Sequence, residues 1–272
     1  MGAIYYGNYN LAKNLIESGA HLNLQWIGIS PLFLAILKSN ENIVEVLVRN
    51  GADLNLEENG ISPLMAAIAS NNDRISEILI TAGAKLNLLV HNVSPLMAAI
   101  ECKNNNIAEM LINNGADLNL QNSDGITALM SAIYKNNDSV SEMLINSGAN
   151  LNLHDGLGKT ALIYAQEQEN HNITQILIDS GAEHNTQNDK GHTALNYALE
   201  QENHDITEAP INHGEDPNTQ NDIGHSALNY ALEQENHDTT EVLINHGEDP
   251  NTQKDIGHSA LNYALEQDNH DI

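Results

Sequence analysis

A short phrase, Gly-Ala-x-Leu-Asn, returns along this chain at a nearly constant interval. Intact or altered, it begins at Gly19, Gly51, Gly83, Gly115, Gly148, Gly181, Gly214 and Gly247. The first three intervals are 32 residues long and the last four are 33 residues long. Such a period over most of a chain indicates one supersecondary element stacked on copies of itself. An array of this kind has no central core around which an enzyme pocket would form.

Each repeat also contains a hydroxyl residue followed by Pro or Ala and then Leu. This second phrase begins at Ser30, Ser62, Ser94, Thr127, Thr160, Thr193, Ser226 and Ser259. A hydroxyl side chain caps the first amides of a helix, and Pro is tolerated at the first helical position. Apolar residues follow at helical spacing, as at Leu32 and Ile36, and again after a polar gap, as at Ile43 and Leu47. The sequence therefore predicts two short amphipathic helices per repeat.

Two turn positions complete the repeat. The Gly of the first phrase is expected to end the second helix in the left-handed conformation. Another Gly precedes most of the helix-start hydroxyls, as at Gly60 and Gly125, and Asn92 replaces it once. Asn tolerates left-handed backbone better than other residues with a side chain, so this exception fits the same turn.

A repeat that combines a turn, two antiparallel helices and a period of 32 or 33 residues is similar to the ankyrin repeat. The segments 124–129, Asp-Gly-Ile-Thr-Ala-Leu, and 115–119, Gly-Ala-Asp-Leu-Asn, resemble that family's signature. The resemblance implies an all-α solenoid of stacked helix-turn-helix repeats joined by β-hairpin-like turns. One departure from the family recurs in every repeat. The family commonly has a hydrogen-bonding His after the helix-start Leu. This chain has Phe, Met, Ile or Asn there, from Phe33 to Asn262.

We expect a single ankyrin-repeat array over residues 1–272. It comprises a partial repeat at 1–24, seven whole repeats at 25–253 and a partial repeat at 254–272. Terminal repeats of a solenoid need a polar outer face, and neither end is obviously built as one. We therefore expect the sequence to be a piece of a longer protein. The alternative is a natural product whose ends simply fray. We expect the array to be a monomer.

Cysteine usage and hydropathy bear on location. Cys102 is the only cysteine, which excludes an internal disulfide and fits a reducing compartment. Its register places it exposed near the end of a first helix. The chain has no basic and apolar leader at its start and no run approaching the ~20 apolar residues of a membrane span. These features predict an intracellular location, cytoplasmic or nuclear, without a membrane partner.

The net charge of −27 is unevenly distributed. Residues 1–136 carry 12 acidic and 7 basic side chains, whereas residues 137–272 carry 25 and 3. Proteins bind nucleic acids and anionic lipids through Lys and Arg side chains. The acidic second half therefore argues against either as a partner. It favours a protein partner that is basic. The alternative is a solvated acidic surface that maintains solubility and recognises nothing.

The late repeats are close copies that carry unusual residues. Residues 191–223 and 224–256 match at 28 of 33 positions, which indicates recent duplication. Pro210 falls inside a second helix, where it removes an amide and clashes with the preceding turn. Thr239 replaces an apolar core residue, and Glu215 and Glu248 replace the Ala of the turn phrase. We predict that the repeats from residue 188 onward are less stable than those before.

Three sequence patterns partly resemble nucleotide-binding or metal-binding sites. Residues 156–160, Gly-Leu-Gly-Lys-Thr, end like a phosphate-binding loop, but Leu153 stands where the motif needs Gly, and Gly158 is in register with the turn Gly. The alternating ligands from Asp216 lack the Gly and the final Glu of a calcium loop. Histidine columns such as His192, His225 and His258 are spaced too widely for a closed zinc site. We expect no catalytic residue, metal or cofactor.

The histidines still predict one property. Eleven of the thirteen lie after residue 150. Their unperturbed pKa of about 6.5 means that they would reduce the negative charge of the chain as the pH falls from about 7 to 5. Weakly pH-dependent partner binding is therefore a hypothesis.

The resemblance also implies where a partner would bind. Contact positions of ankyrin repeats lie beside the turn Gly and at the end of the first helix, on the concave side. They are Trp26, Ile27, Ile29 and Lys38 in the second repeat, Asp124, Ile126, Tyr134 and Lys135 in the fifth, Asp189, His192, Glu200 and Gln201 in the seventh, and Asp222, His225, Glu233 and Gln234 in the eighth. Trp26 is the only Trp, and it is either an exposed binding anchor or packed against the partial first repeat.

The function predicted from these features is a protein-binding scaffold that is not an enzyme. It would use mixed apolar contacts in its first half and acidic contacts in its second, with the preference changing near residues 137–188. Two alternatives stay open: a targeting or regulatory segment of a larger enzyme or adaptor, and a decaying repeat array without a selected partner.

Overall fold

The computed structural model describes residues 1–200, 218–221, 224–233 and 237–249. The chain divides into two compact units, Met1–Ser123 and Asp124–Ile272, which we call the N-terminal unit and the C-terminal unit. Pro210 and Glu215, two of the substitutions noted above, lie outside the described residues.

Each unit is built from helix pairs, as the sequence predicts. In the described part of the chain the first helices have seven residues, apart from the four-residue α1, and the second helices have nine. The N-terminal unit contains α1 (Gly2–Tyr5), α2 (Tyr9–Glu17), α3 (Pro31–Leu37), α4 (Glu41–Arg49), α5 (Pro63–Ala69), α6 (Asp73–Thr81), α7 (Pro95–Glu101) and α8 (Asn105–Asn113). The C-terminal unit contains α9 (Ala128–Tyr134), α10 (Asp138–Asn146), α11 (Ala161–Glu167), α12 (His171–Asp179), α13 (Ala194–Glu200), α15 (Ala227–Glu233) and α16 (His237–Asn245).

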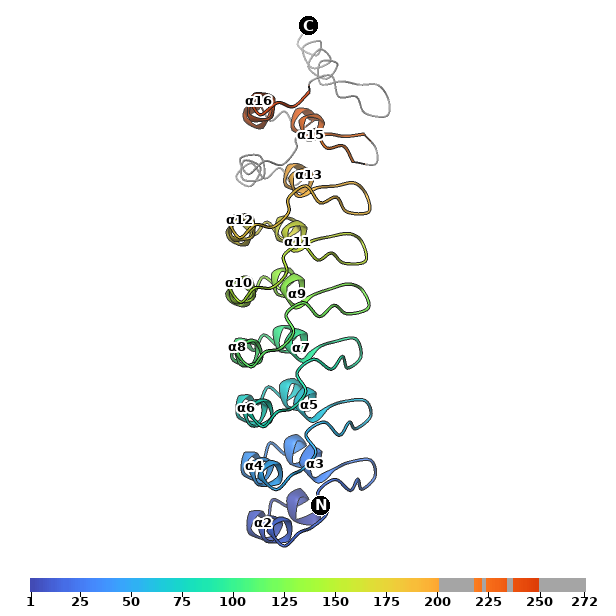
Figure 1. Ribbon diagram of the computed structural model, residues 1–272, viewed down its shortest axis with the longest axis vertical. Helices are drawn as coiled ribbons and strands as arrows, with labels where there is room; N and C mark the ends of the chain where they lie inside the picture. Colours follow the sequence, from blue (N-terminus) through green and yellow to red (C-terminus); the bar gives the residue numbers. More distant parts are fainter. Residues whose placement is uncertain (201–217, 222–223, 234–236, 250–272) are drawn as a thin grey trace. The chain divides into compact units, whose positions relative to one another are not determined.

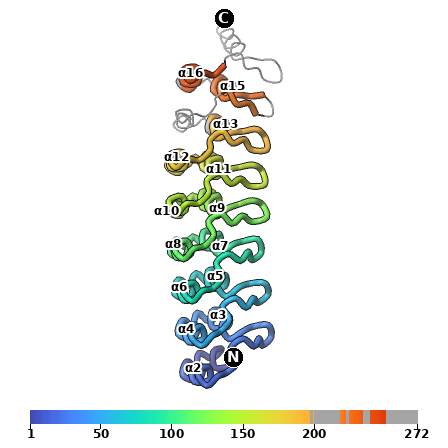
Figure 2. The backbone as a smooth tube through the Cα atoms, in the orientation of Figure 1, coloured from blue at the N-terminus to red at the C-terminus, as the bar shows by residue number. Residues whose placement is uncertain are grey.

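Within each unit the helices form two layers. The first helices of successive repeats lie beside one another and the second helices form a parallel row, with the hairpin loops on the side of the first helices (Figure 1). Figure 2 shows the same alternation of helix pair and loop along the backbone. No described helix combines the length and the apolar character that a bilayer crossing requires.

The predicted hydroxyl caps are confirmed at the start of the first helices. Ser30 Oγ accepts a hydrogen bond from the Phe33 amide at 3.1 Å. Equivalent caps are made by Ser62, Ser94, Thr127 and Thr160. At Thr193 the replacement of the family's His by Asn also serves the cap, because Asn196 Oδ1 accepts from the Thr193 amide at 3.0 Å. Such reciprocal bonding satisfies amides that a helix start leaves unpaired.

The second helices begin at an asparagine that the sequence analysis did not single out. Asn40 Oδ1 accepts from the Ile43 amide at 3.1 Å. The same cap is made by Asn72, Asn104, Asn137 and Asn170. Asn is among the best residues at this position, and each cap contributes about 1 kcal/mol relative to Ala. The Asn before each of these second helices therefore has a structural role.

The Asn of the repeated phrase joins neighbouring repeats. Asn23 Oδ1 accepts from the Asp53 amide at 2.8 Å, thirty residues further along the chain. In the same way Asn55 accepts from the Lys85 amide, Asn87 from the Asp117 amide, Asn152 from the Glu183 amide and Asn218 from the Asp249 amide. The last residue of the phrase is therefore an Asn because its side chain accepts a hydrogen bond from the backbone of the next repeat.

The core is the stripe of apolar residues that the helical spacing predicts. Ile36 on α3 and Ile43 and Leu47 on α4 are fully buried, and later repeats bury the equivalent residues. Fully burying one such side chain contributes about 1.5–3 kcal/mol. Thr239 on α16 occupies the position of Ile43 and is buried, as its register predicts.

The hairpins are of two kinds, and the 32-residue intervals contain the shorter kind. Trp26 and Ile29 exchange backbone hydrogen bonds at 2.9 and 3.1 Å. Between them Ile27 and Gly28 both have positive φ, 54° and 74°. Two left-handed residues in a two-residue hairpin define a type I′ turn. Asn59 with Gly60, and His91 with Asn92, repeat it, which confirms the left-handed role predicted for Asn92.

The 33-residue intervals contain a longer hairpin. Asp155 Oδ1 accepts from the amides of Leu157 and Lys159 at 2.8 and 2.9 Å, so a side chain organises this turn. Asn188 and Asn221 repeat the arrangement. The extra residue of the longer period therefore lies in the hairpin.

In the C-terminal unit the longer hairpins also bond to one another. The Gly156 amide donates to the Asp124 carbonyl at 2.7 Å, and the Asp189 amide donates to the Leu157 carbonyl at 3.0 Å. The approach is so close that a Cβ on Gly158 would lie 2.9 Å from Asn188 Cα. In the N-terminal unit a Cβ on Gly60 would meet no atom within 4 Å. The change of period thus changes how consecutive hairpins contact each other.

Candidate partner-binding face

The predicted contact residues lie on the hairpins and at the ends of the first helices. We call this surface the hairpin face, meaning residues 25–29 and 37–38 and their equivalents in the other repeats.

In the N-terminal unit the hairpin face carries a cluster of exposed apolar residues. Trp26 is 65 % exposed and Ile27 is 78 % exposed, whereas Ile29 is half-buried. Lys38 is exposed at the end of α3. The structure therefore confirms that Trp26 is solvent-accessible.

Trp26 also borders a hollow of about 620 Å³ beside the first repeat. This aromatic hollow is lined by Met1, Gly2, Tyr5, Tyr6, Trp26, Ile29 and Leu34. The two interpretations of Trp26 are thus combined, because its side chain is exposed and also faces the first repeat. Tyr5 and Tyr6 were missed by the sequence analysis. Their register was the available signal, since they stand where Leu37 and Lys38 stand one repeat later.

In the C-terminal unit the hairpin face begins with an aromatic pair. Tyr134 at the end of α9 is 57 % exposed, and its ring meets the Tyr164 ring edge-on with centroids 6.5 Å apart. Lys135 Nζ lies 5.7 Å from the Tyr134 ring centroid. Asp124 is exposed on the preceding hairpin and Ile126 is half-buried. Tyr164 was not predicted, although Tyr recurs at this register in later repeats.

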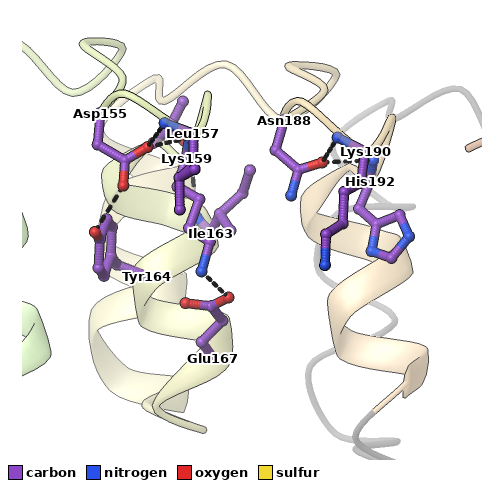
Figure 3. A network of polar contacts seen from close by, with 10 residues as sticks. Asp155, Leu157, Lys159, Ile163, Tyr164, Glu167, Asn188, Lys190 and His192 are labelled. Atoms are coloured by element: carbon purple, nitrogen blue, oxygen red, sulfur yellow. Dashed lines mark hydrogen bonds and ion pairs between the residues drawn. The ribbon is translucent and has the colours of Figure 1, made fainter. Parts of the chain in front are cut away.

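A polar network holds Tyr164 in place (Figure 3). Its hydroxyl donates to Asp155 Oδ2 at 2.8 Å. Burial, and then the hydrogen bond to Asp155, raise the pKa of Tyr164. Lys159 Nζ donates to Glu167 Oε1 at 2.6 Å, so the ammonium of the apparent phosphate-binding loop already has a carboxylate partner. The geometry agrees with rejecting that loop.

The later hairpins place histidine where Lys159 stands. The rings of His192 and His225 lie edge-on to Tyr230, with centroids 6.4 and 5.2 Å away. Asn221 Nδ2 donates to the Tyr230 hydroxyl at 2.9 Å. His225 Nδ1 is 4.0 Å from Glu233 Oε2, in the same register as the Lys159 pair with Glu167. A histidine thus takes the place of Lys159 in these later hairpins.

The side chains of Glu200, Gln201, Asp222 and Gln234 lie outside the described residues. Asp189 is described and exposed, and Glu233 at the end of α15 is exposed. The described residues contain no group of three His, Cys, Asp or Glu side chains able to hold a metal ion. Cys102 is exposed at the end of α7, as predicted.

Comparison with known proteins identifies a matching family and similar solved structures. A family model described as ankyrin repeats (3 copies) matches residues 1–90, 86–155, 141–221 and 200–272, which together span the chain. The chain is also similar to a solved structure, the crystal structure of the ankyrin repeat domain of Bcl-3, described as a unique member of the IkappaB protein family. The sequence identity is 25 %, the TM-score is 0.71, and the match covers 80 % of this chain and 99 % of that chain. No curated protein matches the sequence.

Proposed function

Because the chain belongs to the ankyrin-repeat family, we propose that it is a scaffold that binds a protein partner through the hairpin face. Ankyrin repeats are generally protein–protein interaction modules, and the matched family models contain no enzymatic domain. A fold of this kind specifies a surface, and its ligand depends on the residues that the surface presents.

One observation carries the proposal: large side chains are exposed on the hairpin face where they add nothing to the core. Trp26 and Ile27 in the N-terminal unit and Tyr134 in the C-terminal unit are each more than half exposed. Trp and Tyr are enriched among residues that dominate binding energy, because they bury a large rigid area on contact. These exposed aromatic and apolar residues favour a surface that recognises a partner over one that only keeps the protein soluble.

The charge of the C-terminal unit supports a basic partner segment there. Residues 124–272 carry 26 acidic and 4 basic side chains, a net charge of −22. On its hairpin face Asp124, Asp189 and Glu233 are exposed. Opposite charge accelerates association and its effect weakens with added salt. We propose that the partner presents Lys or Arg to this unit, and that the protein acts as an intracellular monomer.

Quantitative affinity capture from cell extract tests the proposal. The wild type is compared with a double variant, Trp26→Ala with Tyr134→Ala, and with a matched control, Leu15→Ala with Ile244→Ala. The control residues are also about half exposed but lie on the second helices α2 and α16. A partner lost from the double variant and kept by the control supports the proposal. Equal capture by all three proteins, or no specific capture, rejects it.

A further inference from the structure

We infer that the aromatic hollow of the N-terminal unit binds a peptide segment of another protein in which a large apolar side chain stands next to a carboxylate. The inference rests on the proposed function and specifies the partner chemistry at one part of the hairpin face. It also gives the two units opposite charge preferences.

The hollow has the size and lining of a site for an apolar side chain. Its volume of about 620 Å³ is within the range of small-molecule pockets. Three aromatic residues border it and remain accessible: Tyr5 is 57 %, Tyr6 84 % and Trp26 65 % exposed. Covering such area releases about 25 cal/mol per Å² of apolar surface. An apolar anchor is therefore the chemistry that gains most from this hollow.

One aromatic contact and one hairpin shape the hollow. The Tyr5 and Tyr6 rings meet edge-on with centroids 5.2 Å apart. Trp26 is held by the type I′ hairpin, in which it exchanges backbone hydrogen bonds with Ile29. The aromatic side chains thus come from α1, from its C-cap residue Tyr6 and from a tight turn. A wall built on such elements loses little conformational freedom when a ligand enters.

A cation stands at the edge of the hollow. Lys38 Nζ lies 4.4 Å from the Tyr5 ring centroid, so the ammonium is held above one of the lining rings. Within the described residues, Lys13, Arg49 and Arg74 of this unit pair with carboxylates, whereas Lys38 makes no ion pair. None of the seven lining residues is acidic. A ligand carboxylate beside the apolar anchor would meet a cation that has no competing carboxylate.

The same arrangement disfavours a basic segment. A Lys or Arg next to the anchor would approach the Lys38 ammonium, and like charges at close range repel. The occupant is therefore distinguished from the basic partner proposed for the C-terminal unit.

The single Trp of the chain provides a direct readout. Because Trp26 borders the hollow, its fluorescence reports occupancy without a label. The probes are three capped peptides without Trp, of sequence Gly-Ser-Leu-Asp-Ser-Gly, the same peptide with Lys for Asp, and the same peptide with Ser for Leu. We expect a saturable blue shift with the first peptide, and binding at least about fivefold weaker with each of the other two.

Charge reversal at Lys38 is the decisive variant. Lys38→Glu should weaken the Leu-Asp peptide at least about fivefold and strengthen the Leu-Lys peptide. Lys85→Glu makes the same change at an exposed lysine of the third repeat, whereas Lys38 lies over the Tyr5 ring, so this control should leave both affinities unchanged. Circular dichroism of each variant confirms that the helices are retained. Equal binding of the acidic and basic peptides, or no saturable shift, overturns the inference.

Two further outcomes separate this inference from its premise. A blue shift that appears without peptide as protein concentration rises, with dimers in sedimentation, would assign the hollow to a second copy and overturn the inference. In the affinity capture, a partner lost with Tyr134→Ala alone but kept with Trp26→Ala alone would leave the scaffold function standing and reject a role for the hollow. Peptide binding to the hollow without any captured partner would support the inference and count against the scaffold function.

Discussion

At the scale of single residues, Gln166 is the clearest mismatch between side chain and environment. It stands on α11 where earlier repeats have Ile36, Ile68, Ile100 and Ile133, and it is 1 % exposed. Its amide nitrogen and oxygen have no hydrogen-bond partner among the described residues. A buried unsatisfied polar group costs about 1–3 kcal/mol. The sixth repeat is therefore weakened before the late repeats begin.

Gln166→Ile should raise the free energy of unfolding by about 1–3 kcal/mol, because it removes the unpaired amide and restores the side chain used elsewhere. Urea denaturation followed by circular dichroism measures the change. The reciprocal control, Ile133→Gln, should destabilise by a similar amount. A neutral or destabilising result for Gln166→Ile would mean that the amide has a partner that the geometry does not show.

Tyr164 predicts a loss of stability in alkaline solution. Its folded-state pKa is raised by burial and by the hydrogen bond to Asp155, above the unfolded value of about 10. The unfolded chain then loses this proton at lower pH than the folded chain. The contribution is fully present below about pH 10 and is lost as pH rises toward the folded pKa.

The thermal midpoint of the wild type should therefore fall more steeply above about pH 10 than that of Tyr164→Phe. Tyr134→Phe, which alters the exposed ring of the same pair, is the matched control and should follow the wild type. Parallel curves for all three proteins would show that Tyr164 ionises alike in both states. Tyrosinate absorbance during the titration identifies the ionising group.

At the scale of elements, the hairpins differ more than the helices do. The shorter hairpins use two left-handed residues, whereas the longer ones use an Asp or Asn side chain as an internal cap. Only the longer kind forms backbone hydrogen bonds from one hairpin to the next among the described residues. A one-residue insertion thus converts separate turns into a bonded row in the C-terminal unit.

Gly158 and Gly60 make this difference measurable. Both have φ of 77°, so Ala at either position costs about 1–2 kcal/mol of backbone strain. Only at Gly158 would the new Cβ meet a neighbouring hairpin, at 2.9 Å from Asn188 Cα, which adds about 1–3 kcal/mol. Gly158→Ala should therefore destabilise more than Gly60→Ala in denaturant unfolding. Equal losses would contradict the close packing of the longer hairpins.

At the scale of the whole molecule, charge and stability are expected to change along the chain. Residues 1–123 carry 11 acidic and 6 basic side chains, and residues 124–272 carry 26 and 4. In the eighth repeat Thr239 occupies a core position, and Glu248 is buried where earlier repeats have Ala. Glu248 Oε1 accepts from the Leu228 amide at 3.2 Å at the start of α15, which offsets part of its burial.

Native-state hydrogen exchange should show weaker protection after residue 188 than before it, because buried polar side chains such as Thr239 and Glu248 replace apolar ones in the later repeats. The backbone amides of α16 should exchange faster than those of α10. Thr239→Ile, which restores the residue type of the earlier repeats, should slow exchange in α16. Protection after residue 188 that equals or exceeds that of α10 would refute this gradient.

The repeat pattern alone was sufficient to predict the helix pairs, their hydroxyl caps and the left-handed turn residues, whereas it left open whether Trp26 is exposed or packed against the first repeat. Neighbouring repeats bury the same register positions, so local periodicity carries most of the information about an ankyrin fold. Only the tertiary structure decided which residues meet across about thirty positions of sequence. The Asn bonds between repeats, the two kinds of hairpin, the Lys159 pair and the hollow formed by Tyr5, Tyr6 and Trp26 are of this type. Such contacts depend on side-chain direction and on distances of a few ångströms, which spacing along a chain does not specify.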